Sequence, residues 1–145
     1  AHDMNVGIVQ FIKSAQDVAE RRILQQFPQL DWHTIGDGFT WVTQDRIQDM
    51  ATAMRAWDQA VQMIDSHRYD MLILDELNII LNYGYLPLDE VMAAFARRAP
   101  MQHVIVTGRN APAALLEMAD LVSEVRALKH PYKDQGIKAQ RGIEF

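Results

Sequence analysis

The sequence contains no cysteine, which excludes disulfide bonds, thiolate metal sites and a thiol nucleophile. No apolar run approaches the roughly 20 residues that cross a bilayer. The first residues, AHDMNVGIVQFIK, lack the basic start and the cleavage site of a signal peptide. Acidic residues outnumber basic ones, and the formal net charge of -5 argues against general binding to nucleic-acid backbones. We therefore expect a cytoplasmic protein that binds neither membranes nor nucleic acids.

Several motifs that identify enzymes are also missing. There is no GxSxG turn for a nucleophilic serine, and the five histidines form no HExxH pair for a metal. No GxxxxGK[ST] loop, which cradles nucleotide phosphates, occurs in residues 1–145. Function has to be sought in weaker patterns that are spread along the chain.

Apolar runs and helical patterns alternate along the 145 residues, and 49% of all residues are hydrophobic, enough for one domain with a substantial core. The pattern predicts strands over residues 6–12, 32–35, 71–74, 103–108 and 121–125. It predicts helices over residues 17–27, 45–66, 88–98 and 112–119, and an irregular tail over 130–145 with room for a last edge strand. The alternation predicts an α/β fold, a mostly parallel sheet with helices on both faces.

Polar side chains follow the predicted strands where ligands usually bind in such sheets, beyond the carboxyl ends. They come from segments far apart in the sequence, namely Gln10 and Lys13, Asp75 and Glu76, and Thr107, Gly108 and Arg109. We expect these residues to meet at one edge of the sheet.

The stretch MLILDE, residues 71–76, ends an apolar run on two carboxylates. A buried strand that delivers carboxylates to the sheet edge can hold Mg²⁺ on nucleotide phosphates, as a Walker B strand does. The alternative is an ordinary strand that ends in a solvated turn, with Asp75 capping the next helix. In the same way, TGRN could bring Arg109 near an anion, or it could be a turn with an exposed arginine.

The stretch GDGFTWVTQ, residues 36–44, places Phe39 and Trp41 on either side of Thr40. In an extended segment both rings point to the same side, where they could form a flat apolar wall for a large planar ligand. The alternative is that both rings fill the hydrophobic core, which is the commoner fate of such residues.

Taken together, VGIVQFIK, GDGFTWVTQD, MLILDELN, YGYLPLDEV, VIVTGRN and KHPYKDQGIKAQRGIEF closely resemble one family. It is the ATP:corrinoid (cob(I)alamin) adenosyltransferase family of the P-loop type, and the resemblance runs from Val6 to Phe145. It implies a P-loop NTPase fold of the RecA-like type. It also implies transfer of the 5′-deoxyadenosyl group of ATP to the Co(I) centre of a reduced corrinoid, with release of triphosphate, in adenosylcobalamin synthesis or salvage.

The resemblance also implies roles for individual residues. Phe39 and Trp41 would press on the lower face of the corrin and favour a four-coordinate cobalt that is easier to reduce. Asp75 and Glu76 would hold Mg²⁺ on the phosphates. Other corrinoid contacts are expected from Gln10, Phe11, Lys13, Gly38 and Thr40. Nucleotide contacts are expected from Thr107, Gly108, Arg109 and Lys138, some of them across the interface of a homodimer. The resemblance further allows a flavoprotein as the reductant.

The sequence departs from the family at its start. Family members begin with a strand, a GxxxxGK[TS] loop and a helix, whereas AHDMNVGIVQ is similar to the end of that helix and the start of the next strand. We therefore expect a single α/β domain over residues 1–145 that lacks its first strand, P-loop and helix. After QFIK the family usually has a loop with glycine and tryptophan before a GE pair, where this chain has SAQDVAERRIL.

Two other functions remain open on the sequence. A generic P-loop ATPase or kinase-like enzyme would use the same carboxylates for phosphoryl transfer, and it would break a phosphorus–oxygen bond of ATP. A non-catalytic module would bind a corrinoid without turnover, since residues 1–145 contain no phosphate loop.

Overall fold

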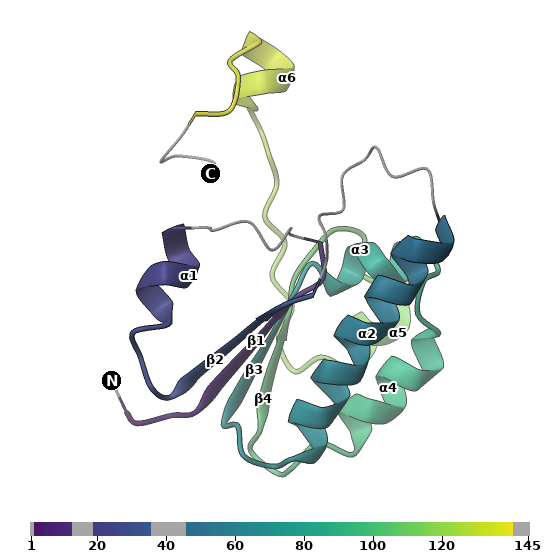
Figure 1. Ribbon diagram of the computed structural model, residues 1–145. Coiled ribbons are helices and arrows are strands. Elements are labelled where there is room, and N and C mark those ends of the chain that lie inside the picture. Colours follow the sequence, from purple (N-terminus) through teal and green to yellow (C-terminus); the bar gives the residue numbers. More distant parts are fainter. Residues whose placement is uncertain (1, 13–18, 36–45, 141–145) are drawn as a thin grey trace.

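The computed structural model describes residues 2–12, 19–35 and 46–140 and shows an α/β architecture (Figure 1). The strands are β1 (Val6–Gln10), β2 (Leu30–Thr34), β3 (Met71–Asp75) and β4 (His103–Val106). The helices are α1 (Ala19–Leu24), α2 (Arg46–Asp65), α3 (Leu77–Asn82), α4 (Leu88–Ala96), α5 (Ala113–Met118) and α6 (Pro131–Gln135).

The strands form a four-stranded sheet in the order β2-β1-β3-β4, and all three pairings are parallel. The chain goes from β1 outward to β2 on one side, then crosses back to β3 and continues to β4 on the other side. The connections that leave β1 and β3 therefore diverge. The carboxyl ends of these two strands form the switch point at which open α/β sheets bind their ligands.

The hydrophobic core lies between the sheet and α2. Side chains alternate along a strand, so Val9 of β1 and Leu72 and Leu74 of β3 face the helices together, and all three are fully buried. The backbone comes very close to the helix at Gly7, where a Cβ atom would lie 2.3 Å from Met63 Cε and 2.6 Å from Leu72 Cδ2. The core partners contributed by α2 are mostly small or β-branched: Ala53, Ala56, Ala60 and Ile64.

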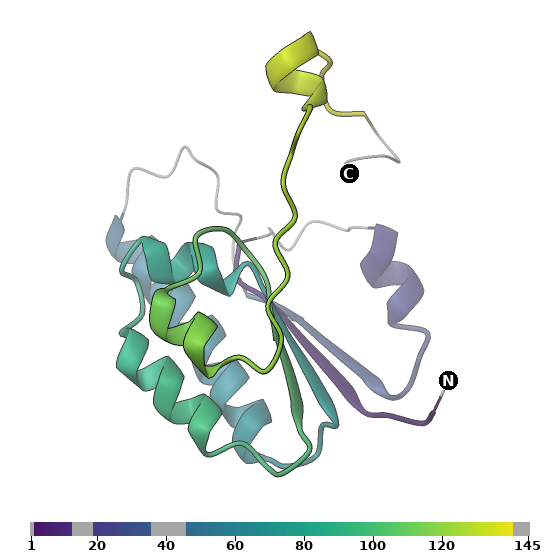
Figure 2. The same ribbon diagram turned by 180° about the vertical axis from the view of Figure 1, so that it is seen from behind.

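The two faces of the sheet are covered unequally. Helices α2 and α4 lie on one side and α1 lies on the other, as Figure 1 and Figure 2 both show. On the α2 side, Trp57 packs edge-on against Phe95 of α4 with ring centroids 6.1 Å apart. The opposite face carries Gln10 and Asp75, paired in the register of β1 and β3, together with Trp32 and Thr34 of β2.

Most predicted elements are confirmed, with shifts of a few residues at their ends. The α/β class and the parallel sheet flanked by helices are confirmed as well. The strand predicted over residues 121–125 is wrong, because this segment pairs with no strand of the described residues and exposes 83% of Leu121 and 97% of Val125. An apolar run makes a strand only where a neighbour supplies hydrogen bonds and cover.

The predicted irregular tail contains a helix. Helix α6 begins where the His130 side chain accepts from the backbone N–H groups of Tyr132 and Lys133, with Pro131 in the first turn, and ends at Gly136 with φ 66°. Both views place α6 apart from the sheet (Figure 2). Residues 130–140 contain no strand.

Helix α3 was also not expected from the sequence. Among the described residues, no helix has the length and apolar character needed to span a bilayer.

We expect two leucine-to-alanine substitutions to distinguish a core position from residues 121–125, the segment wrongly predicted to be a strand. Leu72→Ala should lower the free energy of unfolding by about 2–5 kcal/mol, because it leaves a cavity in the core at a fully buried position. Leu121→Ala, the matched control, should change it by less than about 0.5 kcal/mol. Urea unfolding monitored by circular dichroism measures both. A large loss in Leu121→Ala would mean that residues 121–125 are packed after all.

Candidate functional site

The carboxyl edge of the sheet brings together residues from all three segments that the sequence singled out. Gln10 ends β1, Asp75 ends β3 and Thr107 follows β4. Gln10 Nε2 donates to Asp75 Oδ2 at 3.1 Å, and the Thr107 hydroxyl donates to Asp75 Oδ1 at 2.9 Å. One carboxylate oxygen of Asp75 is thus held from β1 and the other from the residue that follows β4, at the switch point of the sheet.

Glu76 turns the chain sharply from β3 into α3. Its backbone adopts a left-handed conformation, with φ 65° and ψ 19°, which is uncommon for a residue with a side chain. Its N–H donates to the Thr107 hydroxyl at 2.9 Å, which helps to fix this turn. Helix α3 has no side-chain cap, so the alternative in which Asp75 serves as a helix cap finds no support.

Gly108 lets the loop after β4 lie directly against α3. Its φ is 123°, and a Cβ atom there would lie 2.9 Å from Asn78 Cβ and 3.2 Å from Asn78 N. The Asn78 N–H donates to the Thr107 carbonyl at 3.2 Å across this contact. A side chain at position 108 would therefore push α3, and the turn at Glu76, away from the loop.

Arg109 is exposed beside this contact, while its backbone is held in place. The side-chain amide of Asn82, at the end of α3, lies 2.7 Å from the Arg109 carbonyl oxygen and 2.9 Å from that of Asn110. A fixed backbone with an exposed guanidinium suits contact with an anion at the sheet edge. Sequence reasoning did not identify Asn82, whose role becomes visible only when α3 and the loop are placed side by side.

Trp32 and Thr34 of β2 extend the cluster and were also missed. Trp32 Nε1 lies 3.2 Å from Gln10 Oε1 and 3.0 Å from Thr34 Oγ1, and the Thr34 hydroxyl donates to Gln10 Oε1 at 3.2 Å. Their two-residue spacing within the strand predicted over residues 32–35 puts both on one face, which was the available signal.

One further predicted site residue adjoins this cluster, because the Phe11 N–H donates to the Asp75 backbone carbonyl at 3.1 Å. Lys13, Gly38, Phe39, Thr40 and Trp41 lie outside the described residues. Phe11 is 0% exposed and belongs to the core cluster, so its contact with a corrinoid stays a prediction. Lys138 is exposed and follows α6.

The donor set at the edge fits Mg²⁺ better than a softer metal. Asp75 and Glu76 offer carboxylate oxygens and Thr107 a hydroxyl, the hard ligands that Mg²⁺ prefers. Asn78, two residues after Glu76, carries a buried amide oxygen that has no hydrogen-bond partner among the described residues. The described residues contain no group of three or more His, Asp or Glu side chains that could form a complete cage. One or two carboxylates completed by phosphates and water is the usual arrangement for Mg²⁺.

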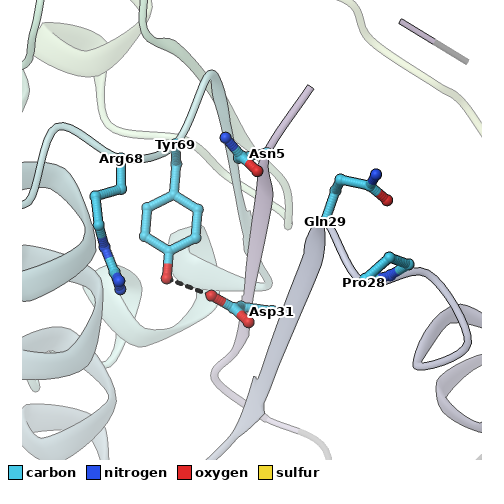
Figure 3. Close-up of a pocket in the computed structure, with 6 residues that line it drawn as sticks. All are labelled: Asn5, Pro28, Gln29, Asp31, Arg68 and Tyr69. Atoms are coloured by element: carbon cyan, nitrogen blue, oxygen red, sulfur yellow. Dashed lines mark hydrogen bonds between the residues drawn. The ribbon is translucent and has the colours of Figure 1, made fainter. Parts of the chain in front are cut away.

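A small pocket of about 180 Å³ lies at the opposite edge of the sheet (Figure 3). The Tyr69 hydroxyl donates to Asp31 Oδ2 at 2.6 Å, and the Arg68 guanidinium lies 5.7 Å from the Tyr69 ring centroid. Burial, followed by this bond to Asp31, raises the pKa of Tyr69 above its usual value. The pocket contains none of the residues predicted from the sequence. Its lining is Asn5, Pro28, Gln29, Asp31, Arg68 and Tyr69.

Comparison with known proteins shows which family this chain is similar to. The model of the family described as ATP:corrinoid adenosyltransferase BtuR/CobO/CobP matches residues 1–145. The corrinoid adenosyltransferase of Pseudomonas aeruginosa is 48% identical over 99% of this chain and 71% of its own length. That of a Sinorhizobium species is 45% identical over 100% of this chain and 69% of its own length. The corrinoid adenosyltransferase CobA of Salmonella typhimurium is 42% identical, with 99% and 72% covered.

We expect Gly108→Ala to destabilise the site edge more than an alanine at another glycine with positive φ. Backbone strain alone should lower the free energy of unfolding by about 1–3 kcal/mol, and the close approach to Asn78 adds to this loss. The control is Gly84→Ala, where φ is 67° and no atom lies within 4 Å, so only the strain applies. Urea unfolding of both variants makes the comparison. Equal losses would show that contact between the loop and α3 does not restrict position 108.

Proposed function

The chain belongs to the ATP:corrinoid adenosyltransferase family, and on this premise we propose that it transfers the 5′-deoxyadenosyl group of ATP to the cobalt of a reduced corrinoid, in adenosylcobalamin synthesis or salvage. The observation that carries the proposal is the match along the whole chain, with 48% identity to one corrinoid adenosyltransferase. In the reaction the electron pair of Co(I) attacks C5′ of ATP. A cobalt–carbon bond forms, the C5′–oxygen bond breaks, cobalt becomes Co(III), and triphosphate leaves with the oxygen.

The chemistry explains why the chain needs no nucleophile of its own. Co(I) is a strong nucleophile, so the protein has to position C5′, exclude water and oxidants, and stabilise the charge on the leaving triphosphate. An edge rich in oxygen ligands with an exposed arginine is suited to the last task. The absence of cysteine, GxSxG and HExxH motifs is consistent with this division of labour.

We assign the phosphate side of the reaction to the edge around Asp75. Asp75 and Glu76 would hold Mg²⁺, which neutralises phosphate charge when it is bound there. Asp75 is oriented by Thr107 and Gln10, and Glu76 by its strained turn. Thr107, Gly108 and Arg109 lie on the adjoining loop and would contact the nucleotide, and Lys138 would join them from the tail.

We assign the corrinoid side to the loop after β2. Phe39 and Trp41 would cover the lower corrin face and remove the axial ligand of cobalt, with Lys13, Gly38 and Thr40 nearby. Thr34, at the end of β2, lies within the same hydrogen-bonded cluster as Asp75. Residues 36–45, which carry the aromatic pair, follow β2 in the sequence, and this supports our proposal that the corrinoid binds close to the phosphate side.

Further features belong to the proposal. We expect a homodimer and a flavoprotein as reductant, as the family resemblance implies, and a cytoplasmic location, which the lack of cysteine favours. We also expect residues 1–145 to act as one domain whose phosphate-binding half is completed by a strand, P-loop and helix. In support, the relatives are longer than the segment matched, which covers 69–72% of their lengths.

The first test mixes the purified protein anaerobically with ATP, Mg²⁺ and chemically reduced cobalamin, and follows the visible spectrum before and after a light flash. We expect a photolabile alkyl-cobalt species and release of triphosphate. The competing function, phosphoryl transfer, shares the same carboxylates but breaks a phosphorus–oxygen bond. ADP and phosphate without a photolabile species would therefore support that function and overturn the proposal.

We expect Trp41→Ala to spare ATP binding and to remove the four-coordinate Co(II) signal, because the wall beneath the corrin is lost. Trp41→Phe is the matched control and should keep most of the signal, since it retains an aromatic face. The Co(II) spectrum recorded with ATP and cob(II)alamin distinguishes the variants. An unchanged spectrum in Trp41→Ala would contradict the role given to this residue.

A further inference from the structure

We propose that Gln10 is a positioning residue that aims the Asp75 carboxylate, and that Trp32 and Thr34 fix the direction in which the Gln10 amide points. The inference rests on the proposed function, in which Asp75 serves the Mg²⁺–nucleotide side of the reaction. It gives Gln10 a role on the metal side of the site rather than in direct contact with the corrinoid.

The proposal starts from a continuous row of side chains across the carboxyl edge. Trp32 and Thr34 of β2 contact Gln10 of β1, and Gln10 contacts Asp75 of β3. The row continues to Thr107 beyond β4. It therefore joins all strands of the sheet at the switch point, where a ligand is expected.

The side chains on either side of Gln10, Trp32 and Asp75, determine which way the Gln10 amide is oriented. An indole N–H can only donate, so Trp32 favours the carbonyl oxygen of the Gln10 amide over its NH₂ group. An ionised carboxylate can only accept, so Asp75 must face the NH₂ group. Both requirements are met by one orientation of the amide, the one observed, with Oε1 toward Trp32 and Nε2 toward Asp75.

Thr34 strengthens this preference. Its hydroxyl accepts from Trp32 Nε1 at 3.0 Å and donates to Gln10 Oε1 at 3.2 Å. Gln10 Oε1 thus faces two donors, and a flipped amide would set its NH₂ group against both. With Gln10 only 3% exposed, little water is available to compensate for such a flip.

A second chain of hydrogen bonds reaches Asp75 from the other side. The Glu76 N–H donates to the Thr107 hydroxyl, and that hydroxyl donates to Asp75 Oδ1. Asp75 is therefore the final acceptor of both chains, with one side-chain donor on each oxygen among the described residues. A carboxylate has about four lone-pair positions, so these two bonds leave about two for Mg²⁺ or its water ligands.

The competing explanation is that Gln10 is simply a buried polar residue with satisfied hydrogen bonds. Gln102 serves as the comparison, because it is also a buried glutamine, 4% exposed. Its Nε2 donates to the Tyr69 backbone carbonyl at 3.1 Å, while its Oε1 has no hydrogen-bond partner among the described residues. It precedes β4 and so lies at the opposite edge of the sheet. A purely structural role predicts similar behaviour for leucine at either position.

The experiment measures the Mg²⁺ concentration that gives half-maximal binding of a non-hydrolysable ATP analogue, by calorimetry, in Gln10→Leu, Trp32→Phe and Gln102→Leu. We expect Gln10→Leu to raise this concentration about 10-fold or more, the usual effect of losing a group that orients a metal ligand. Binding of the analogue without Mg²⁺ should be unchanged. Trp32→Phe, which removes only the N–H donor, should shift it in the same direction by less, because Thr34 still donates. Gln102→Leu should leave it unchanged.

The outcomes separate this inference from the proposed function. Equal Mg²⁺ requirements in Gln10→Leu and Gln102→Leu overturn the positioning role. If Gln10→Leu does not fold, Trp32→Phe decides, and no shift there overturns it as well. Glu76→Gln is the reference for a lost metal ligand. If the wild type binds the analogue equally well with and without Mg²⁺, and Glu76→Gln does not change this binding, the metal site itself is overturned. A shift in Gln10→Leu in a protein that forms no alkyl-cobalt product supports the positioning role and overturns only the adenosyltransferase assignment.

Discussion

The parallel register between β1 and β3 is the constraint on which the site depends. It sets Gln10 beside Asp75, while the register between β1 and β2 sets Gln10 opposite Thr34. A slip by one residue would turn every side chain of β1 to the other face of the sheet. Gln10 would then enter the core, and Val9 would face the carboxylate. Burial of Val9, Leu72 and Leu74 beneath α2 opposes this slip, so the apolar core also determines the arrangement of the polar edge.

The sequence predicted the parts of the fold that rest on periodicity. The strands that end at Gln10, Asp75 and Val106 were foreseen, as was the long helix α2, because their apolar patterns are regular. Their meeting at one edge followed from the rule that parallel strands share their carboxyl ends. Helix α6 could have been foreseen too, since Pro131 and Gly136 are usual signals of a helix start and end.

Other features could not be read from the sequence because they depend on distant neighbours. The left-handed turn at Glu76 is stabilised by Thr107, a residue that only the folded sheet brings close. The support of the Arg109 backbone by Asn82 has the same origin. Residues 121–125 show the opposite error, since their β-branched and apolar composition was sufficient for a strand but no described strand lies beside them. Local preference was overruled by the lack of a partner.

The long sequence separations within the cluster have a consequence for biosynthesis. Gln10 and Asp75 are 65 positions apart, and Thr107 follows Asp75 by a further 32. On the ribosome, β1 emerges early and can pair first with β2, whose contacts with Gln10 span only 22–24 positions. The carboxylate is oriented on both oxygens only after residue 107 has left the exit tunnel. Loop-closure entropy makes such distant pairings slow, so we expect a nascent chain to organise its polar edge only after β1 and β2 have paired.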